Sequence, residues 1–132
     1  MSTDTSSPYK LILKNSTSQS LQSYWFSHQA DEAITYGGGT DLTSNQQSAP
    51  IPITVIGGHN DYWTVSVVEA NGDLYSTDLL VKANIASGLP SGTQVTLSVM
   101  PATSNTLQVY IEYPGYSAGP LTMSLFGQPT AD

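Results

Sequence analysis

The segment GGHNDYW, residues 57–63, brings an imidazole, an amide, a carboxylate and two aromatic rings together directly after a glycine pair. His59 and Asp61 are two positions apart and could form an acid–base pair or supply two metal ligands. Positions two apart share a face only on a strand, and the glycine pair predicts a turn, where side-chain directions are unspecified. We therefore expect a surface turn at one end of the fold, and no ready-made reactive site.

A metal site would need ligands from a second segment of the chain. His28, with Asp31 or Glu32 nearby, could complete a site of two histidines and a carboxylate, which is typical of zinc. The alternative, which we favour, is that His28 and His59 are ordinary loop histidines. A small metal-dependent enzyme is thus the third of our functional hypotheses.

Calcium is a better metal candidate than zinc, because it prefers hard oxygen ligands. Asp31, Glu32, Asp41 and Asp61, with backbone carbonyls of glycine-rich loops, could supply such oxygens. No dense Asp-x-Asp-x-Asp run is present, and acidic proteins carry surface carboxylates for solubility alone. We therefore predict no metal ligands and no cofactor, with calcium as the alternative.

Other catalytic arrangements have little support in the sequence. The chain is rich in serine but has no Gly-x-Ser-x-Gly elbow. Glu69 and Glu112 lie within predicted strands, where no carboxylate partner of the glycosidase type is identifiable. The triple glycine at residues 37–39 has neither the lysine nor the helix of a phosphate-binding loop. We predict no catalytic residues and a protein that is not an enzyme.

The charge pattern narrows the range of partners. The net charge is −7, and the only basic residues are Lys10, Lys14 and Lys82. Nucleic acids and anionic membrane surfaces need basic faces, so both partners are disfavoured. With 10% charged residues and many hydroxyl and amide side chains, the surface suits a neutral polar ligand such as carbohydrate.

Length and composition predict one packed domain. The chain has 132 residues and no cysteine, so its stability must come from packing. We expect a flexible polar tail over 1–8, one domain over 9–127 and a short tail over 128–132. No apolar stretch is long enough to cross a bilayer, and the start has no apolar signal region, so we expect a cytoplasmic protein, with non-classical secretion as the alternative.

Alternation of period two runs through most of the chain, and no window has helical periodicity. Short apolar runs separated by turn residues predict an all-β, single-domain antiparallel β-sandwich of about eight strands, with a closed β-barrel as the alternative. A short strand around 34–36 is expected inside a long loop rich in glycine, asparagine and glutamine. Further strands are expected over 9–15, 20–28, 51–56, 93–100, 106–113 and 121–126. Two more β-rich runs are expected within 61–85, and Trp63 begins the first of them.

Asn71-Gly72 is the strongest turn signal in the chain. The dipeptide lies between two β-rich runs and supplies the positive φ angles of a two-residue type I′ hairpin turn. We therefore predict a tight hairpin at this point.

The aromatic residues carry the main functional hypothesis. Trp25 and Trp63 each follow a tyrosine, so tryptophans that fill the core would leave Tyr24 and Tyr62 on the outer surface. Exposed rings beside amides and carboxylates are what sugar binding requires, because the ring covers the apolar face of the sugar. General packing or a subunit interface is the competing use of tyrosine. The ligand-binding residues we predict are Tyr24, His59, Asn60, Asp61, Tyr62 and Tyr110.

These features predict a non-catalytic, lectin-like binding module for a neutral polar ligand. Single shallow sites bind weakly, so we expect a homo-oligomer that gains from multivalency. The alternative is a structural or self-assembling β-protein whose exposed aromatics and edge strands contact other subunits.

Overall fold

The computed structural model describes residues 6–30 and 33–127, which form ten β-strands and no helix. The predicted all-β class is confirmed. Because the described residues form no helix, none of them belongs to a helix that could span a membrane. The strands are β1 (Ser6–Asn15), β2 (Leu21–Ala30), β3 (Ala33–Leu42), β4 (Ile51–Ile56), β5 (Asp61–Glu69), β6 (Leu74–Ser76), β7 (Val81–Lys82), β8 (Thr93–Thr103), β9 (Thr106–Tyr113) and β10 (Tyr116–Gly127).

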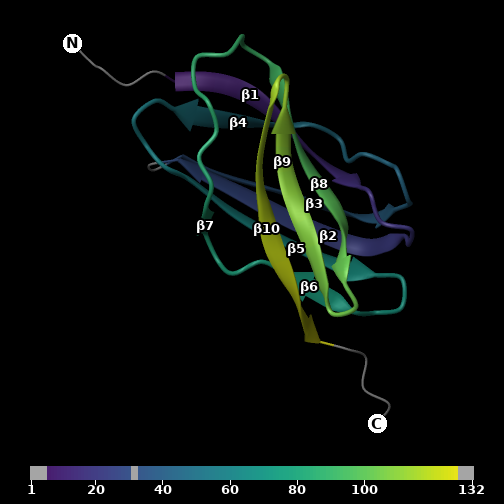
Figure 1. Ribbon diagram of the computed structural model, residues 1–132. Coiled ribbons are helices and arrows are strands. Elements are labelled where there is room, and N and C mark those ends of the chain that lie inside the picture. Colours follow the sequence, from purple (N-terminus) through teal and green to yellow (C-terminus); the bar gives the residue numbers. More distant parts are fainter. Residues whose placement is uncertain (1–5, 31–32, 128–132) are drawn as a thin grey trace, which may run out of the picture.

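All ten strands belong to one mixed sheet in the order β3-β2-β5-β6-β10-β9-β8-β1-β4, with β7 paired to β5. The sheet coils so that β8, β9 and β10 cross in front of β2, β3 and β5 (Figure 1). Its two edge strands, β3 and β4, approach each other. The closeness is seen at Gly37 of β3, where an added Cβ atom would lie only 2.8 Å from Cδ1 of Ile51 in β4. The sheet is therefore nearly closed and barrel-like, as the predicted barrel alternative describes.

One strand pair departs from the antiparallel pattern. β1 pairs with β8 in parallel, with Leu13 opposite Leu97, and it pairs with β4 in the antiparallel sense. β1 begins at Ser6, so Ser6–Pro8 of the predicted tail belong to a strand. Residues 1–5 and the predicted tail 128–132 lie outside the described residues.

The core lies between the two layers and follows the alternation of period two. Inward-facing residues of β1, β8 and β9 are almost completely buried, as their spacing predicts. Burial of this kind stabilises the fold by roughly 25 cal/mol for each Å² of apolar surface removed from water. These residues are Tyr9, Leu11, Leu13, Val95, Leu97, Val99, Leu107, Val109 and Ile111.

The triple glycine lies in a strand, which corrects the predicted loop. β3 runs without a break through Gly37 and Gly39, whose missing side chains leave room on the inner face for two aromatic rings. A Cβ atom at Gly37 would lie 2.6 Å from Cζ of Phe26, and one at Gly39 would lie 2.5 Å from the hydroxyl of Tyr24. Glycine here allows the backbone of β3 to pack closely against aromatic rings. Because glycine has a low strand propensity, the sequence predicts a loop at these residues.

The predicted hairpin is present between β5 and β6, but its turn differs from the prediction. Gly72 has a φ of +94°, whereas Asn71 is not among the residues with positive φ. Gly72 N donates to Glu69 O at 2.8 Å, and Glu69 N donates to Asp73 O at 2.9 Å. These bonds define a three-residue loop, a type I turn followed by a left-handed glycine, in place of the two-residue type I′ turn.

Replacing Gly72 with valine should destabilise the protein by about 1–3 kcal/mol, because a β-branched residue is strained at positive φ. Thermal unfolding should show a lower Tm for Gly72→Val. The matched control is Gly72→Asn, which should be milder because asparagine adopts the left-handed conformation more readily. Equal Tm values for Gly72→Val and the wild-type chain would contradict this account of the turn.

Candidate functional site

The segment GGHNDYW forms the turn that its glycines predict. β4 ends at Ile56, Gly58 has a φ of +83°, and His59 N donates to Ile56 O at 3.1 Å. β5 begins at Asp61, and the side chain of Trp63 is completely buried. The predicted turn and the predicted inward direction of Trp63 are both confirmed.

The expectation that Asp61 stays at the surface is wrong, since Asp61 is only 1% exposed. Its Oδ1 atom lies 2.7 Å from Nε2 of His28, and its Oδ2 atom accepts a hydrogen bond from Ile85 N at 3.0 Å. Asp61 is already the first residue of β5, so it shares the inner face with Trp63. A buried carboxylate needs such partners, because the desolvation of an unpaired charge is costly.

His28 is not a loop histidine, as the sequence had suggested. It lies in β2, is 1% exposed, and its ring centroid is 4.5 Å from that of Trp63. Among the described residues, Nδ1 of His28 has no hydrogen-bond partner. A catalytic base must reach a proton of the substrate. The burial of both residues places the pair out of such reach, so we interpret it as structural.

Asp61 and Trp63 also hold the segment that follows β7. Asp61 N donates to Oδ1 of Asn84 at 2.8 Å, and Ala83 N donates to Asp61 O at 3.0 Å. Nε1 of Trp63 donates to Ala83 O at 2.7 Å. The start of β5 therefore fixes the backbone of residues 83–85 against the barrel.

The described residues contain no group of three or more His, Asp or Glu side chains that could hold a metal ion. Of the carboxylates considered for calcium, Asp61 is committed to His28, and Asp41 is exposed on β3. Asp31 and Glu32 lie outside the described residues.

Asn60 and Tyr62 form a small polar cluster on the outer surface. Nδ2 of Asn84 donates to Oδ1 of Asn60 at 3.0 Å, and Nδ2 of Asn60 lies 3.4 Å from the hydroxyl of Tyr62. Tyr62 is half-buried and lies on the face of β5 opposite Trp63, as predicted. His59 is half-buried beside this cluster in sequence. The structure thus brings Asn60 and Tyr62 together and directs Asp61 inward.

The Tyr-Trp pair of β2 has the reverse orientation to the one expected. Tyr24 packs against the core, and its ring is stacked on Phe26 with centroids 6.3 Å apart. Trp25 points outward, is 39% exposed and lies 5.9 Å from the ring of Tyr36. The cause is the glycine-rich inner face of β3, which accommodates the tyrosine ring.

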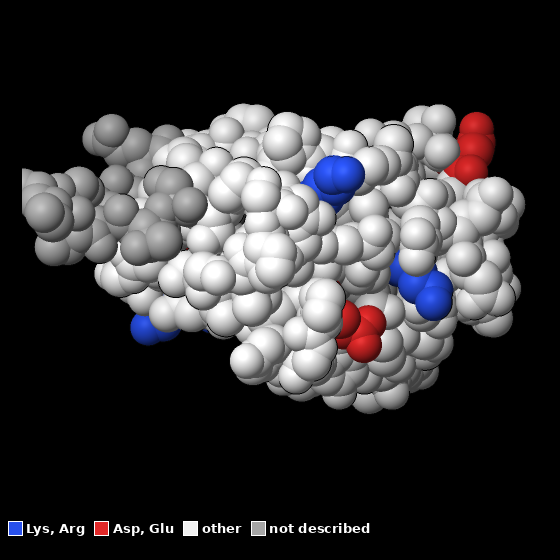
Figure 2. Space-filling view, turned by 90° about the horizontal axis from the view of Figure 1, so that it is seen from above, with Lys and Arg blue, Asp and Glu red and all other residues white. Residues whose placement is uncertain are grey.

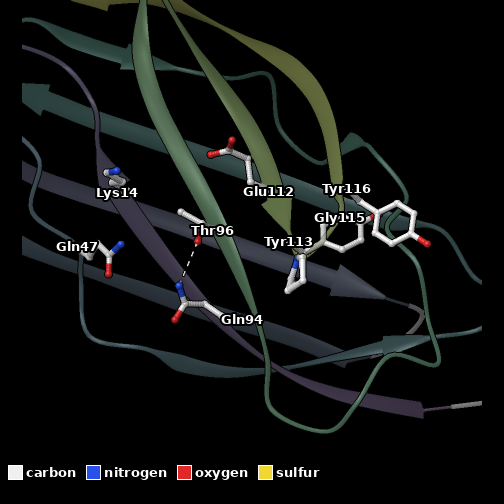
Figure 3. A pocket seen from close by; sticks show the side chains of 9 residues that line it. Lys14, Gln47, Gln94, Thr96, Glu112, Tyr113, Gly115 and Tyr116 are labelled. Atoms are coloured by element: carbon white, nitrogen blue, oxygen red, sulfur yellow. Dashed lines mark hydrogen bonds between the residues drawn. The ribbon is translucent and has the colours of Figure 1, made fainter.

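A pocket of about 420 Å³ lies on the outer face of β1, β8 and β9 (Figure 3). β1 contributes Lys14, β8 contributes Gln94 and Thr96, and β9 contributes Glu112. These residues alternate with buried inward-facing neighbours, so they share the outer face. Thr96 lies directly opposite Glu112 in the ladder between β8 and β9. Strand register therefore brings these four side chains together.

Two walls border this floor. On one side Gln47 forms an isolated bridge with Lys14. On the other side the turn between β9 and β10, residues 113–116, carries two tyrosine rings whose centroids are 5.1 Å apart. Figure 3 shows Lys14 and Gln47 on one side of Thr96, with Glu112 and the turn on the other. The hydroxyl of Tyr113 accepts a hydrogen bond from Ala86 N at 3.2 Å, which anchors this wall.

Charge is sparse around the pocket, as it is on the face shown in Figure 2, where most side chains are neither acidic nor basic. Lys14 and Glu112 are the charged residues in the lining. The one ion pair among the described residues joins His28 and Asp61, so neither Lys14 nor Glu112 has an ionic partner within the described chain. The pocket therefore offers two opposite charges, amides, a threonine hydroxyl and a tyrosine rim.

The pocket contains none of the ligand-binding residues predicted from the sequence. Tyr110 lies nearest in the sheet, because it shares the outer face of β9 with Glu112. Tyr116 is 56% exposed at the rim. Lys14 and Gln94 were missed, since polar residues at alternate strand positions are also typical of ordinary surface. Gln47 was missed because it lies outside the strands, in the segment between β3 and β4.

A second acidic group lies at the hairpin between β5 and β6. Glu69 is buried, and this burial, followed by the nearby Asp73 carboxylate, raises its pKa above the ordinary value of 4.5. Burial, and then the charges of Glu69 and Asp73, raise the pKa of Tyr75 as well. The group has no basic member, so the ionised form of Glu69 is disfavoured in the folded state. We infer that this group lowers the stability of the fold when Glu69 is ionised.

The comparison with known proteins gives no family for this chain, because neither a protein-family model nor a curated protein sequence matches it. The assignment of function therefore depends on the geometry of the site.

Replacing Asp61 with alanine should lower the free energy of unfolding by about 3 kcal/mol or more, because it leaves the buried His28 ring and the Ile85 amide without their partner. Urea denaturation measures this change. The matched control is Asn60→Ala, which removes the neighbouring exposed side chain and should cost less than about 1 kcal/mol. Similar losses for both variants would contradict the structural role of the pair.

Glu69→Gln should make the stability less dependent on pH. The raised pKa means that the folded state holds the Glu69 proton more tightly than the unfolded state does. Ionisation therefore favours unfolding, and the free energy of unfolding should fall as pH rises from 4.5 through the raised pKa. Glutamine does not titrate, so the variant should lose this part of the decrease.

Urea titrations at a series of pH values across this window would measure the slope. Asp73→Asn is the informative control, because it removes the smaller cause of the shift and leaves burial in place. We expect its slope to lie between those of the wild-type chain and Glu69→Gln. Parallel stability curves for all three proteins would refute the assignment to Glu69.

Proposed function

We propose that this protein is a non-catalytic, lectin-like module that binds a net-neutral polar ligand of the carbohydrate class in the pocket on β1, β8 and β9. The observation that supports this proposal is the lining of the pocket, in which amides, a hydroxyl and one charge of each sign meet a tyrosine rim. The rings and the polar groups suit a sugar, since aromatic rings cover its apolar face while polar side chains bind its hydroxyls.

The composition supports the same class of ligand. The chain has three basic residues and a net charge of −7, so a nucleic-acid partner is disfavoured. A pocket with one lysine and one glutamate has no excess charge of its own, which suits a ligand with none. The predicted cytoplasmic location, the absence of membrane insertion and the absence of catalysis belong to this proposal as well.

Tyr116→Ala should weaken glycan binding without unfolding the protein, because its ring is 56% exposed and lies at the rim. Losing one ring contact should reduce the affinity roughly tenfold. A glycan array displaying the protein at high valency would identify a ligand, and calorimetry would then compare the variant with the wild-type chain.

The matched control for this experiment is Tyr36→Ala, which removes another exposed tyrosine, 62% accessible, from outside the pocket. It should leave the affinity for a monovalent glycan unchanged in calorimetry, because that affinity does not depend on association between copies of the chain. If the folded protein binds no glycan at high valency, or if Tyr36→Ala and Tyr116→Ala weaken binding equally, the proposal is wrong.

Self-association is the second candidate, and a specific surface supports it. Trp25 of β2 and Ile34 and Tyr36 of β3 form an exposed group on the outer face of these strands, which we name the β2–β3 aromatic face. β3 is also an edge strand of the sheet. Exposed aromatics beside an unpaired strand edge are typical of subunit interfaces, and no charged side chain belongs to the group.

Analytical ultracentrifugation over a range of concentrations would test this candidate. We expect the wild-type chain to form a homo-oligomer and the double variant Trp25→Ser, Tyr36→Ser to dissociate, because exposed aromatics contribute most of the energy of such contacts. Tyr116→Ser serves as the control and should keep the oligomer intact. A wild-type chain that stays monomeric at every concentration would eliminate the candidate.

A further inference from the structure

The pocket is lined by two residues of opposite charge, Lys14 and Glu112, that form no ion pair with each other. Lys14 is one of only three basic residues in the chain, and Glu112 faces the same cavity from the other side (Figure 3). β8 lies between their strands in the sheet. Neighbouring strands are about 4.8 Å apart, so the backbones of β1 and β9 are separated by roughly 10 Å.

The register adds a second offset between the two charges. Ile12 lies opposite Thr96, and Thr96 lies opposite Glu112, so Lys14 is two residues further along β1 than the position level with Glu112. No ion pair joins them among the described residues. A small ion at one residue is therefore too far from the other to contact both, whereas a sugar ring with substituents at both ends has the length to do so.

Each end of the pocket favours a different group. The ammonium of Lys14 is suited to a phosphate or carboxylate, which it binds as a point charge. Glu112 is suited to an ammonium group, whose hydrogen bonds its carboxylate accepts. The net charge of −7 repels anions from most of the protein surface. Lys14 is the basic residue of the pocket lining, so an anionic group of the ligand should lie beside it.

The middle of the pocket offers uncharged partners. Thr96 lies on β8 between the strands of the two charged residues, and Gln94 lies two positions earlier on β8, with its amide 3.5 Å from the threonine hydroxyl. This distance is at the long limit of a hydrogen bond, so both groups remain available to a ligand. They can donate to and accept from the hydroxyls of a sugar ring.

We infer that the pocket selects a zwitterionic saccharide, one that carries an ammonium group toward Glu112 and an anionic group toward Lys14. This inference rests on the proposed carbohydrate-binding function and specifies its ligand class. Such a ligand is net neutral, yet both of its charges are paired when it is bound. Desolvating either charge of the pocket without a partner would be costly, which disfavours uncharged sugars of the same size.

A matched series of monosaccharides tests this selection. At about pH 5, where a phosphate monoester carries close to one negative charge, glucosamine 6-phosphate has one charge of each sign, glucosamine only the cation, glucose 6-phosphate only the anion, and glucose neither. Titrations followed by NMR chemical shifts should show that glucosamine 6-phosphate binds roughly tenfold or more tightly than either singly charged sugar, the gain expected from one hydrogen bond between charged groups. The advantage should shrink as salt is added.

Two variants assign each charge to one end of the pocket. Glu112→Gln should remove the preference for glucosamine 6-phosphate over glucose 6-phosphate, and Lys14→Gln should remove the preference over glucosamine. Lys10→Gln is the matched control, because Lys10 lies on the same face of β1 but does not line the pocket. Circular dichroism and Tm would confirm that all three variants are folded.

The outcomes separate this inference from the proposed function. If glucose binds as tightly as glucosamine 6-phosphate and the Glu112 and Lys14 variants bind like the wild-type chain, the charge selection is wrong and the carbohydrate function stands. If phosphocholine, which has both charges but no sugar ring, binds more tightly than glucosamine 6-phosphate, the saccharide class is wrong. If no sugar binds on the glycan array or in this series, both proposals are overturned.

Discussion

The buried carboxylate of Asp61 imposes the strongest single constraint on this fold. An ionisable group that is 1% exposed must have polar partners, and Asp61 obtains them from His28 in β2 and from the backbone of Ile85. These bonds join two neighbouring strands to a segment that lies 24 residues further along the chain. These bonds consequently fix the segment that follows β7 in place against the barrel.

The constraint extends from this segment to the candidate site. Ala86 accepts a hydrogen bond from the hydroxyl of Tyr9 at 2.7 Å, and its N–H donates to the hydroxyl of Tyr113 at 3.2 Å. Tyr113 in turn stacks on Tyr116 at the edge of the pocket. A continuous set of hydrogen bonds and ring contacts thus connects the buried carboxylate with the tyrosine wall, so the rigidity of that wall depends on the core.

The sequence predicts the class of fold well because alternation of period two is a direct record of burial. Val95, Leu97 and Val99 point inward as their spacing requires. The errors occur where a residue type has two physical uses. Glycine is typical of turns, but in β3 it makes room for the rings of Tyr24 and Phe26. An aspartate after a glycine turn is usually exposed, but Asp61 has a histidine partner 33 positions earlier, which no local pattern reveals.

The candidate site is harder to predict than the core, because its residues become neighbours only through strand order. The parallel pairing of β1 with β8 brings Lys14 beside residues some 80 positions away, and no local signal in the sequence specifies a parallel pair. Four of the six predicted ligand residues, 59–62, are adjacent in sequence, and in that segment Asn60 contacts Tyr62 while Asp61 is buried. Alternation can say that Lys14 faces outward, but it cannot say which strand lies next to it.

The two candidate surfaces of the barrel are compatible with each other, and this has a consequence for function. The pocket lies on β1, β8 and β9, whereas the β2–β3 aromatic face lies on strands of the opposite layer (Figure 1). Association through the aromatic face would therefore leave every pocket open to solvent. Several weak sites on one particle bind a multivalent ligand far more tightly than one site does, provided that the sites can be occupied together. The exposed aromatics and the polar pocket suggest different functions when taken separately. Together they can serve one function, the binding of a multivalent ligand by an oligomer.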